Sequence, residues 1–140
     1  MTPNEVISQT FEYCAAADID ITPAVYTAFF SADPRALQLM GHSDGPMRGR
    51  MLDEALVLLM SEPTEQNMGY LQWEVDNHLL AYGVQLDMYQ GFFDAVQAAV
   101  RSALAEAWLP EHEQAWSTTI ARLQAAIAEQ AAVQKGGTKL

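Results

Sequence analysis

The chain has 140 residues, of which half are apolar and 18% are charged, and its formal net charge is -11. This composition is typical of one folded domain and excludes an intrinsically disordered chain. The excess of carboxylates would repel nucleic-acid phosphates and anionic lipid headgroups, both of which need a basic partner surface. We therefore predict no nucleic-acid partner and no membrane partner.

The N-terminus and the apolar runs bear on location. No apolar run reaches the roughly 18 residues that span a bilayer, and the opening MTPNEVISQT lacks the basic and apolar regions of a secretory signal. These features predict a cytoplasmic protein. The single cysteine, Cys14, allows neither an internal disulfide nor a thiolate metal cluster, and it is expected to be a small core residue.

Helix-start signals recur along the chain. The segment TPNE forms a capping box, in which Thr2 can accept from a free backbone amide and Glu5 can reach back, with proline at the first helical position. A first helix should end near Ala16. The same use of proline predicts further helix starts near Thr22, Asp33, Asp44 and Leu109.

Apolar spacing also favours helices, because the intervals are three and four residues. One stripe contains Leu52, Leu56 and Leu59, and a second contains Met68, Leu71, Val75, His78 and Tyr82. The segment 88–104 is apolar over a wide arc and should lie near the middle of the fold. The last helix presents Trp116, Ile120, Leu123 and Ile127. We predict an all-α domain over residues 1–133 and a flexible tail over residues 134–140.

The three histidines are the candidate ligands. No two of them have metal-ligand spacing, and no phosphate loop or nucleophile elbow is present. His42 and His112 fall in polar surroundings and are expected at the surface. His78, in VDNHLLAYGV, lies within an apolar stripe, where a histidine is either a hydrogen-bonded core residue or a ligand. A haem iron needs one such neutral imidazole and an apolar slot, which an all-α fold can supply.

Four segments, taken in order, resemble the globin family, particularly bacterial single-domain globins and the globin domain of flavohaemoglobins. They are VYTAFFSADPRALQLM, MRGRMLDEALVLLM, HLLAYGVQLDMYQGFFDAV and LPEHEQAWSTTIARL. The resemblance covers nearly the whole chain. It implies a globin fold of six to eight helices, with haem b (iron protoporphyrin IX) held in a pocket between globin helices E and F.

The resemblance also implies roles for the residues that would line the haem. His78 would bind the iron on the proximal side. Tyr26, eight residues before Pro34, would lie on the distal side and donate a hydrogen bond to the gas; the alternative is a packing residue with a solvated hydroxyl. Arg48 or Met47 would occupy the distal position on helix E. The remaining cofactor-binding residues would be Met40, Leu52, Val84, Tyr89 and Phe93.

Two positions depart from the usual globin pattern. Met40 stands where globins almost always place a phenylalanine against the haem, and methionine can pack there without providing a flat ring. Gly83 follows His78 by five residues, whereas four is the commoner bacterial spacing, and one residue turns a helical side chain by about 100°. The haem-binding interpretation therefore stands beside a globin-like fold without haem.

The expected function is reversible binding of dioxygen or another diatomic gas at a haem iron. Nitric oxide dioxygenation would need electrons from a separate reductase, because no flavin or nicotinamide domain occurs within these residues, so enzymatic activity is left open. The alternative is a haem-free globin-like sensor or protein-interaction module. In that case His78 would be a buried hydrogen-bonded residue, and the acidic surface would meet a protein partner.

Overall fold

The computed structural model describes residues 1–61 and 86–137, and every regular element within those ranges is helical, so the all-α prediction is confirmed there. The second predicted apolar stripe, from Met68 to Tyr82, lies outside these ranges. The helices are α1 (Pro3–Ala16), α2 (Thr22–Ala32), α3 (Pro34–Met40), α4 (Gly45–Met60), α6 (Leu86–Leu104) and α7 (Pro110–Gly137), with a short 3-10 turn η1 (Ala105–Ala107) between the last two.

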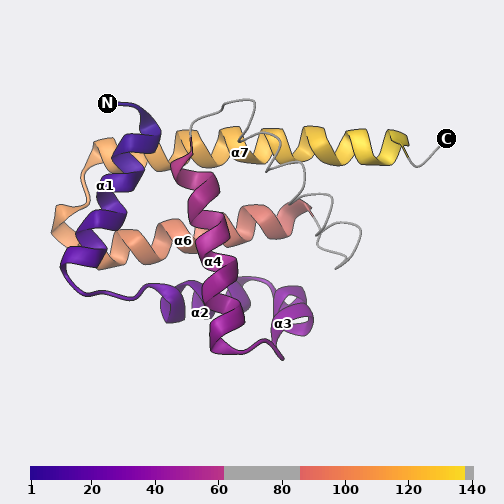
Figure 1. Ribbon diagram of the computed structural model, residues 1–140, viewed down its shortest axis with the longest axis horizontal. Helices are drawn as coiled ribbons and strands as arrows, with labels where there is room; N and C mark the ends of the chain where they lie inside the picture. Colours follow the sequence, from indigo (N-terminus) through magenta and orange to yellow (C-terminus); the bar gives the residue numbers. More distant parts are fainter. Residues whose placement is uncertain (62–85, 138–140) are drawn as a thin grey trace.

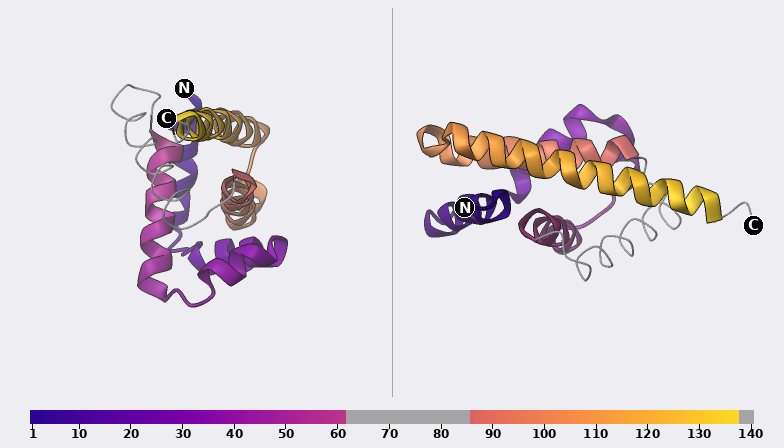
Figure 2. Two further views of the ribbon diagram at one scale, coloured as in Figure 1. Left: turned by 90° about the vertical axis from the view of Figure 1, so that its right-hand side faces the viewer. Right: turned by 90° about the horizontal axis from the view of Figure 1, so that it is seen from above.

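The helices form two crossed layers. Helices α7, α6 and α2 lie one below another in Figure 1, and α1 and α4 run steeply across them. Figure 2 shows α1 and α4 on one side of the α6–α7 pair when the molecule is seen from above. Helix α6 packs against α1, α2 and α7, which confirms the predicted central position of the segment 88–104.

The helix starts follow the local signals in the sequence. Thr2 Oγ1 accepts from the Glu5 amide at 3.2 Å, and the Glu5 carboxylate accepts from the Thr2 amide at 3.4 Å. The Asp44 carboxylate accepts from the Met47 amide at 2.8 Å at the start of α4. These bonds satisfy amides that have no partner within the first helical turn, and all the proline-marked starts are confirmed.

The core is made by the apolar faces that the spacing predicts. The stripe of α7 is buried, with Trp116 and Ile127 fully inaccessible to solvent, and Phe93, Val96 and Val100 of α6 are buried beside it. Cys14 is buried too, as expected, and burial raises the pKa of its thiol.

The C-terminal helix is longer than the sequence suggests. Helix α7 continues to Gly137, so residues 134–137 of the expected flexible tail are helical, while residues 138–140 lie outside the described ranges. The exact domain boundary at residue 133 stays a prediction. Across the described parts of the chain, no helix combines the length and apolar character that crossing a membrane requires.

A buried amide joins three helices at one end of α4. Asn4 of α1 is 2% exposed, and its Nδ2 donates to the carbonyl oxygens of Leu59 and Ser61, at 2.9 Å each. Its Oδ1 accepts from the Arg122 guanidinium of α7 at 3.0 Å. The last carbonyls of a helix have no partner within the helix. Asn4 therefore caps α4 and ties it to α1 and α7.

Replacing Asn4 by alanine should lower the free energy of unfolding by about 2–4 kcal/mol, because two carbonyls and one guanidinium would lose their shared partner. Urea denaturation followed by circular dichroism would measure the shift in midpoint. The matched control is Thr118→Ala, at an exposed polar residue of α7. Equal effects of the two substitutions would contradict a special role for Asn4.

Candidate functional site

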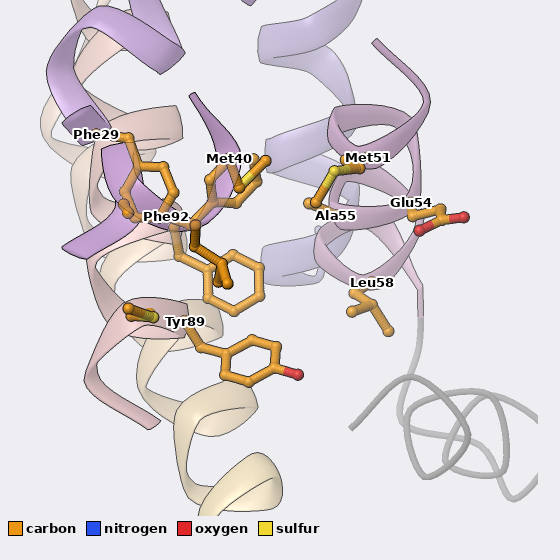
Figure 3. Close-up of a pocket in the computed structure, with 12 residues that line it drawn as sticks. Phe29, Met40, Met51, Glu54, Ala55, Leu58, Tyr89 and Phe92 are labelled. Carbon is orange, nitrogen blue, oxygen red and sulfur yellow. The ribbon is translucent and has the colours of Figure 1, made fainter. Parts of the chain in front are cut away.

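The described residues enclose a pocket between α4 and α6, closed at one end by α2 and α3. The cavity has a volume of about 90 Å³, and its lining is almost entirely apolar. Figure 3 shows the α4 side chains on one wall and the α6 side chains on the other. The lining residues are Phe29, Ala36, Leu39, Met40, Met51, Glu54, Ala55, Leu58, Met88, Tyr89, Phe92 and Phe93.

Three of the residues expected to bind the cofactor are brought together here. Met40 lines the pocket from the end of α3, and Tyr89 and Phe93 line it from α6. In Figure 3 the Tyr89 ring extends from α6 toward the side formed by α4. The expected iron ligand, His78, and the expected haem-contacting residue Val84 lie outside the described residues.

Tyr26 is buried beside the pocket but does not line it. It is 3% exposed, and its hydroxyl donates to the backbone carbonyl of Arg48 at 2.9 Å. Its ring lies between Phe30 and Phe92, with centroid distances of 5.6 and 5.7 Å. Burial raises the pKa of Tyr26 to about 12, and the positive charge of Arg48 acts in the opposite direction. The packing alternative supposed a solvated hydroxyl, but here the hydroxyl is bonded within the protein.

Arg48 also stays out of the pocket lining. Its guanidinium carbon lies 5.5 Å from the centroid of Tyr26 and 5.0 Å from that of Phe30, which are cation–π distances. Its Nε donates to Ser43 Oγ at 2.8 Å, and Ser43 Oγ donates to the Met40 carbonyl at 2.5 Å. Arg48 thus holds together α2, the end of α3 and the first turns of α4. The alternative distal residue, Met47, is 39% exposed and is not part of the lining.

The wall that α4 presents lies one residue, or about 100° of rotation about the helix axis, from the expected one. Leu52 is buried in the core and does not line the pocket, whereas Met51, Ala55 and Leu58 do. These three residues recur at intervals of four and three, one position from the stripe of Leu52. The apolar spacing of Met51, Ala55 and Leu58 is visible in the sequence. Spacing alone does not show which of two adjoining apolar faces of a helix meets a pocket and which meets the core.

Aromatic rings form the opposite wall. Phe29 of α2 and Phe92 of α6 meet edge to face, with ring centroids 5.1 Å apart. This arrangement suits the charge distribution of aromatic rings and fixes both side chains. Phe92 belongs to the wide apolar arc predicted for α6, yet only the packing of α2 onto α6 shows that it faces the pocket.

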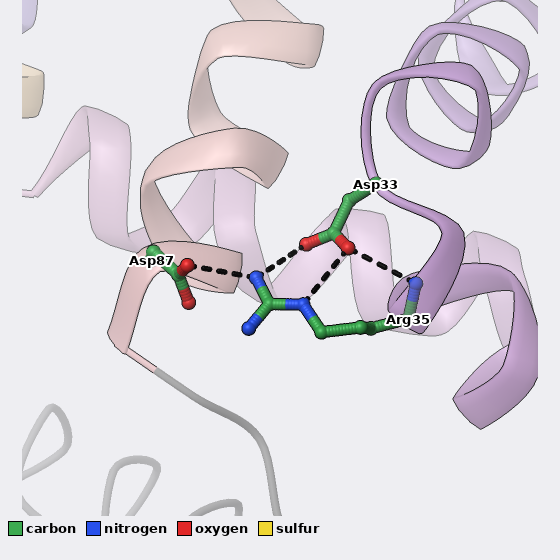
Figure 4. A network of polar contacts seen from close by, with 3 residues as sticks. All are labelled: Asp33, Arg35 and Asp87. Carbon is green, nitrogen blue, oxygen red and sulfur yellow. Dashed lines mark hydrogen bonds and ion pairs between the residues drawn. The ribbon is translucent and has the colours of Figure 1, made fainter.

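Polar groups are sparse in the described lining. Glu54 and Tyr89 supply them, and the Glu54 carboxylate points away from Phe92 and Tyr89 in Figure 3. Outside the lining, Arg35 joins the start of α3 to the start of α6: its guanidinium pairs with Asp33 at 2.9 Å and with Asp87 at 2.7 Å (Figure 4). The hydrogen bond from Arg35 is the main cause that lowers the pKa of Asp33.

The other two histidines lie away from the pocket. His42 is exposed in the turn before α4. His112 is half-buried, and its Nδ1 accepts from the Leu109 amide at 2.8 Å, so it caps the start of α7. In the described ranges, no group of three or more histidine, cysteine or acidic side chains is placed to hold a metal ion.

When compared with models of known protein families and with curated proteins, the chain matches none of them. The case for a function therefore rests on the residues and the pocket.

The buried phenol of Tyr26 should make stability depend on alkaline pH. The folded pKa of about 12 lies above the ordinary value of 10, so the neutral phenol contributes stability that is complete below pH 10 and lost as the pH rises toward 12. The loss attributable to Tyr26 is on the order of 2 kcal/mol. Tyr26→Phe should remove that part of the decline, measured by urea denaturation between pH 9 and 12.

Tyr13→Phe, at a tyrosine that is 44% exposed, is the matched control. An alkaline decline that is the same in wild type and Tyr26→Phe would show that this phenol does not control the pH dependence.

Proposed function

We propose that this chain is a globin-like haem protein that reversibly binds dioxygen or another diatomic gas, with haem held in the pocket between α4 and α6 and His78 as the axial ligand. The observation that carries the proposal is the pocket itself. Met40 of α3 and Tyr89 and Phe93 of α6, which the resemblance to globins assigns to the haem, meet at this apolar site.

The lining suits a flat, largely apolar cofactor. Aliphatic side chains of α4 on one wall and aromatic side chains of α2 and α6 on the other would exclude water from the two faces of a macrocycle. Haem, when bound, supplies the iron to which a gas binds. The chain supplies the walls, and the apolar stripe around His78 predicts that its imidazole faces the interior.

A haem-free globin-like sensor or interaction module is the second candidate. One observation favours it: Tyr26, Arg48 and Ser43 satisfy one another and the backbone without any ligand. In that case the apolar pocket would be a packing defect or a site for another small molecule, and the acidic surface would meet a protein. Nitric oxide dioxygenation would be a further activity of the haem protein only if a separate reductase supplied electrons.

Purified protein mixed with haem should show a strong Soret band that His78→Ala abolishes or shifts, because that variant lacks the axial imidazole. His42→Ala is the matched control, since His42 is exposed and does not line the pocket. Absorption spectra of the ferric and ferrous forms are the measurement. A wild-type protein that folds and takes up no haem would sink the proposal.

Filling the pocket should also abolish haem uptake. Ala55 is 8% exposed and lines the pocket from α4, so Ala55→Trp would put an indole into the space that the cofactor needs. Val57→Trp, at a residue of the same helix that is 48% exposed, is the control. Haem titration with circular dichroism as a check on folding would distinguish a blocked pocket from an unfolded chain, and unchanged uptake by folded Ala55→Trp would place the haem elsewhere.

A further inference from the structure

The pocket between α4 and α6 offers apolar contact and little that would hold water. Its volume is about 90 Å³, and in the described lining only Glu54 and Tyr89 carry an oxygen on the side chain. The Glu54 carboxylate points away from the aromatic wall (Figure 3). A buried water needs about two to four polar partners, whereas a void with apolar walls stays dry and accepts apolar molecules. The interior of this pocket therefore suits an uncharged, apolar ligand.

The pocket is held in shape by contacts that lie outside it. Asn4 fixes the C-terminal end of α4 through the carbonyls of Leu59 and Ser61. Tyr26 fixes the N-terminal end through the carbonyl of Arg48. A helix that is hydrogen-bonded at both ends relaxes only partly into a void beside its middle. The space is therefore a built part of the fold, and its occupant does not have to create it.

Sulfur-containing and aromatic side chains make up much of the described lining. Met40, Met51 and Met88 contribute thioethers from α3, α4 and α6. Phe29 and Phe92 contribute rings that meet edge to face, with centroids 5.1 Å apart. Thioether sulfur makes favourable contacts with aromatic rings, and rings attract one another edge to face. Methionine side chains are also flexible enough to adjust around a ligand. This lining favours an aromatic ring over an aliphatic ring of similar size.

We infer that this pocket binds a single uncharged aromatic ring, with benzene as the simplest member of the class. An engineered apolar cavity of about 150 Å³ binds benzene. A pocket of about 90 Å³ accommodates one such ring when its methionines adjust, and it excludes two fused rings. An anionic ring would find no positive charge in the described lining and would be buried at high cost. A macrocycle would require α4 and α6 to move apart, so this inference does not rest on the proposed function.

The experiment titrates benzene into the purified chain without haem, labelled with ¹³C at its methionine methyl groups, and follows the methyl resonances by NMR. The resonances of Met40, Met51 and Met88 should shift and saturate, because these residues line the pocket. Met1 and Met47, which are 74% and 39% exposed, are internal controls whose resonances should stay in place. Cyclohexane should bind at least about threefold more weakly than benzene, because it forms no sulfur–aromatic contacts.

Variants of α4 test whether the pocket is the site. Ala55→Trp should abolish the saturable shifts, because the indole fills the space, whereas Val57→Trp, at an exposed residue of the same helix, should leave them unchanged. Leu58→Ala enlarges the pocket and should admit naphthalene, which the wild-type chain should exclude. Circular dichroism of each variant checks its fold.

The inference is overturned if benzene causes no saturable shift at the pocket methionines, or shifts Met1 and Met47 equally. It is also overturned if cyclohexane or naphthalene binds the wild-type chain as tightly as benzene. The haem titration is a separate measurement. A chain that binds benzene and takes up no haem would overturn the proposed function alone, and a chain that takes up haem and binds no benzene would overturn this inference alone.

Discussion

The position of α4 depends on the side-chain amide of Asn4. A helix that ends inside a protein leaves carbonyls without partners, and burying them unpaired is costly. The Nδ2 of Asn4 donates to two of these carbonyls, those of Leu59 and Ser61, and its Oδ1 accepts a hydrogen bond from Arg122. The end of α4 is thereby fixed against the first and last helices of the chain, and the wall that α4 gives to the pocket is fixed with it.

The N-terminal end of α4 is held by a different set of contacts. There the hydroxyl of Tyr26 bonds to the Arg48 carbonyl, and the Arg48 side chain closes over two aromatic rings of α2. Together with the Asp44 cap, these contacts place the first turns of the helix against α2. The pocket lies between two anchored ends, and its opposite wall is set by the packing of α2 onto α6 through Phe29 and Phe92.

The features that could be predicted from the sequence are those that depend on residues close together in the chain. The capping box at Thr2, the proline-marked starts and the buried stripe through Trp116 are local patterns, and all are confirmed. Met40, Tyr89 and Phe93 could be assigned to one site through the resemblance to globins. The rest depends on contacts between distant residues. Asn4 lies 55 residues from Leu59, and no local sequence pattern around Asn4 predicts the hydrogen bond between them.

Contacts between distant residues also explain why Met51 and Ala55 line the pocket where Leu52 was expected. Both stripes of α4 are apolar, and the rotation of the helix about its axis decides which of them meets the pocket. That rotation is set by the long-range hydrogen bonds at the two ends of α4. It was therefore invisible to any analysis of spacing along α4 alone.

Both long-range anchors of α4 reach its main chain. Asn4 binds the carbonyl of Leu59, and Tyr26 binds the carbonyl of Arg48, and every amino acid carries such a carbonyl. The side chains between these points take no part in either bond. Lining residues of α4 can therefore be substituted without loss of the two hydrogen bonds that hold the helix in position. The residues that hold α4 in place are therefore different from those that line the pocket. Substitutions in the lining can change which ligand binds while the fold is kept.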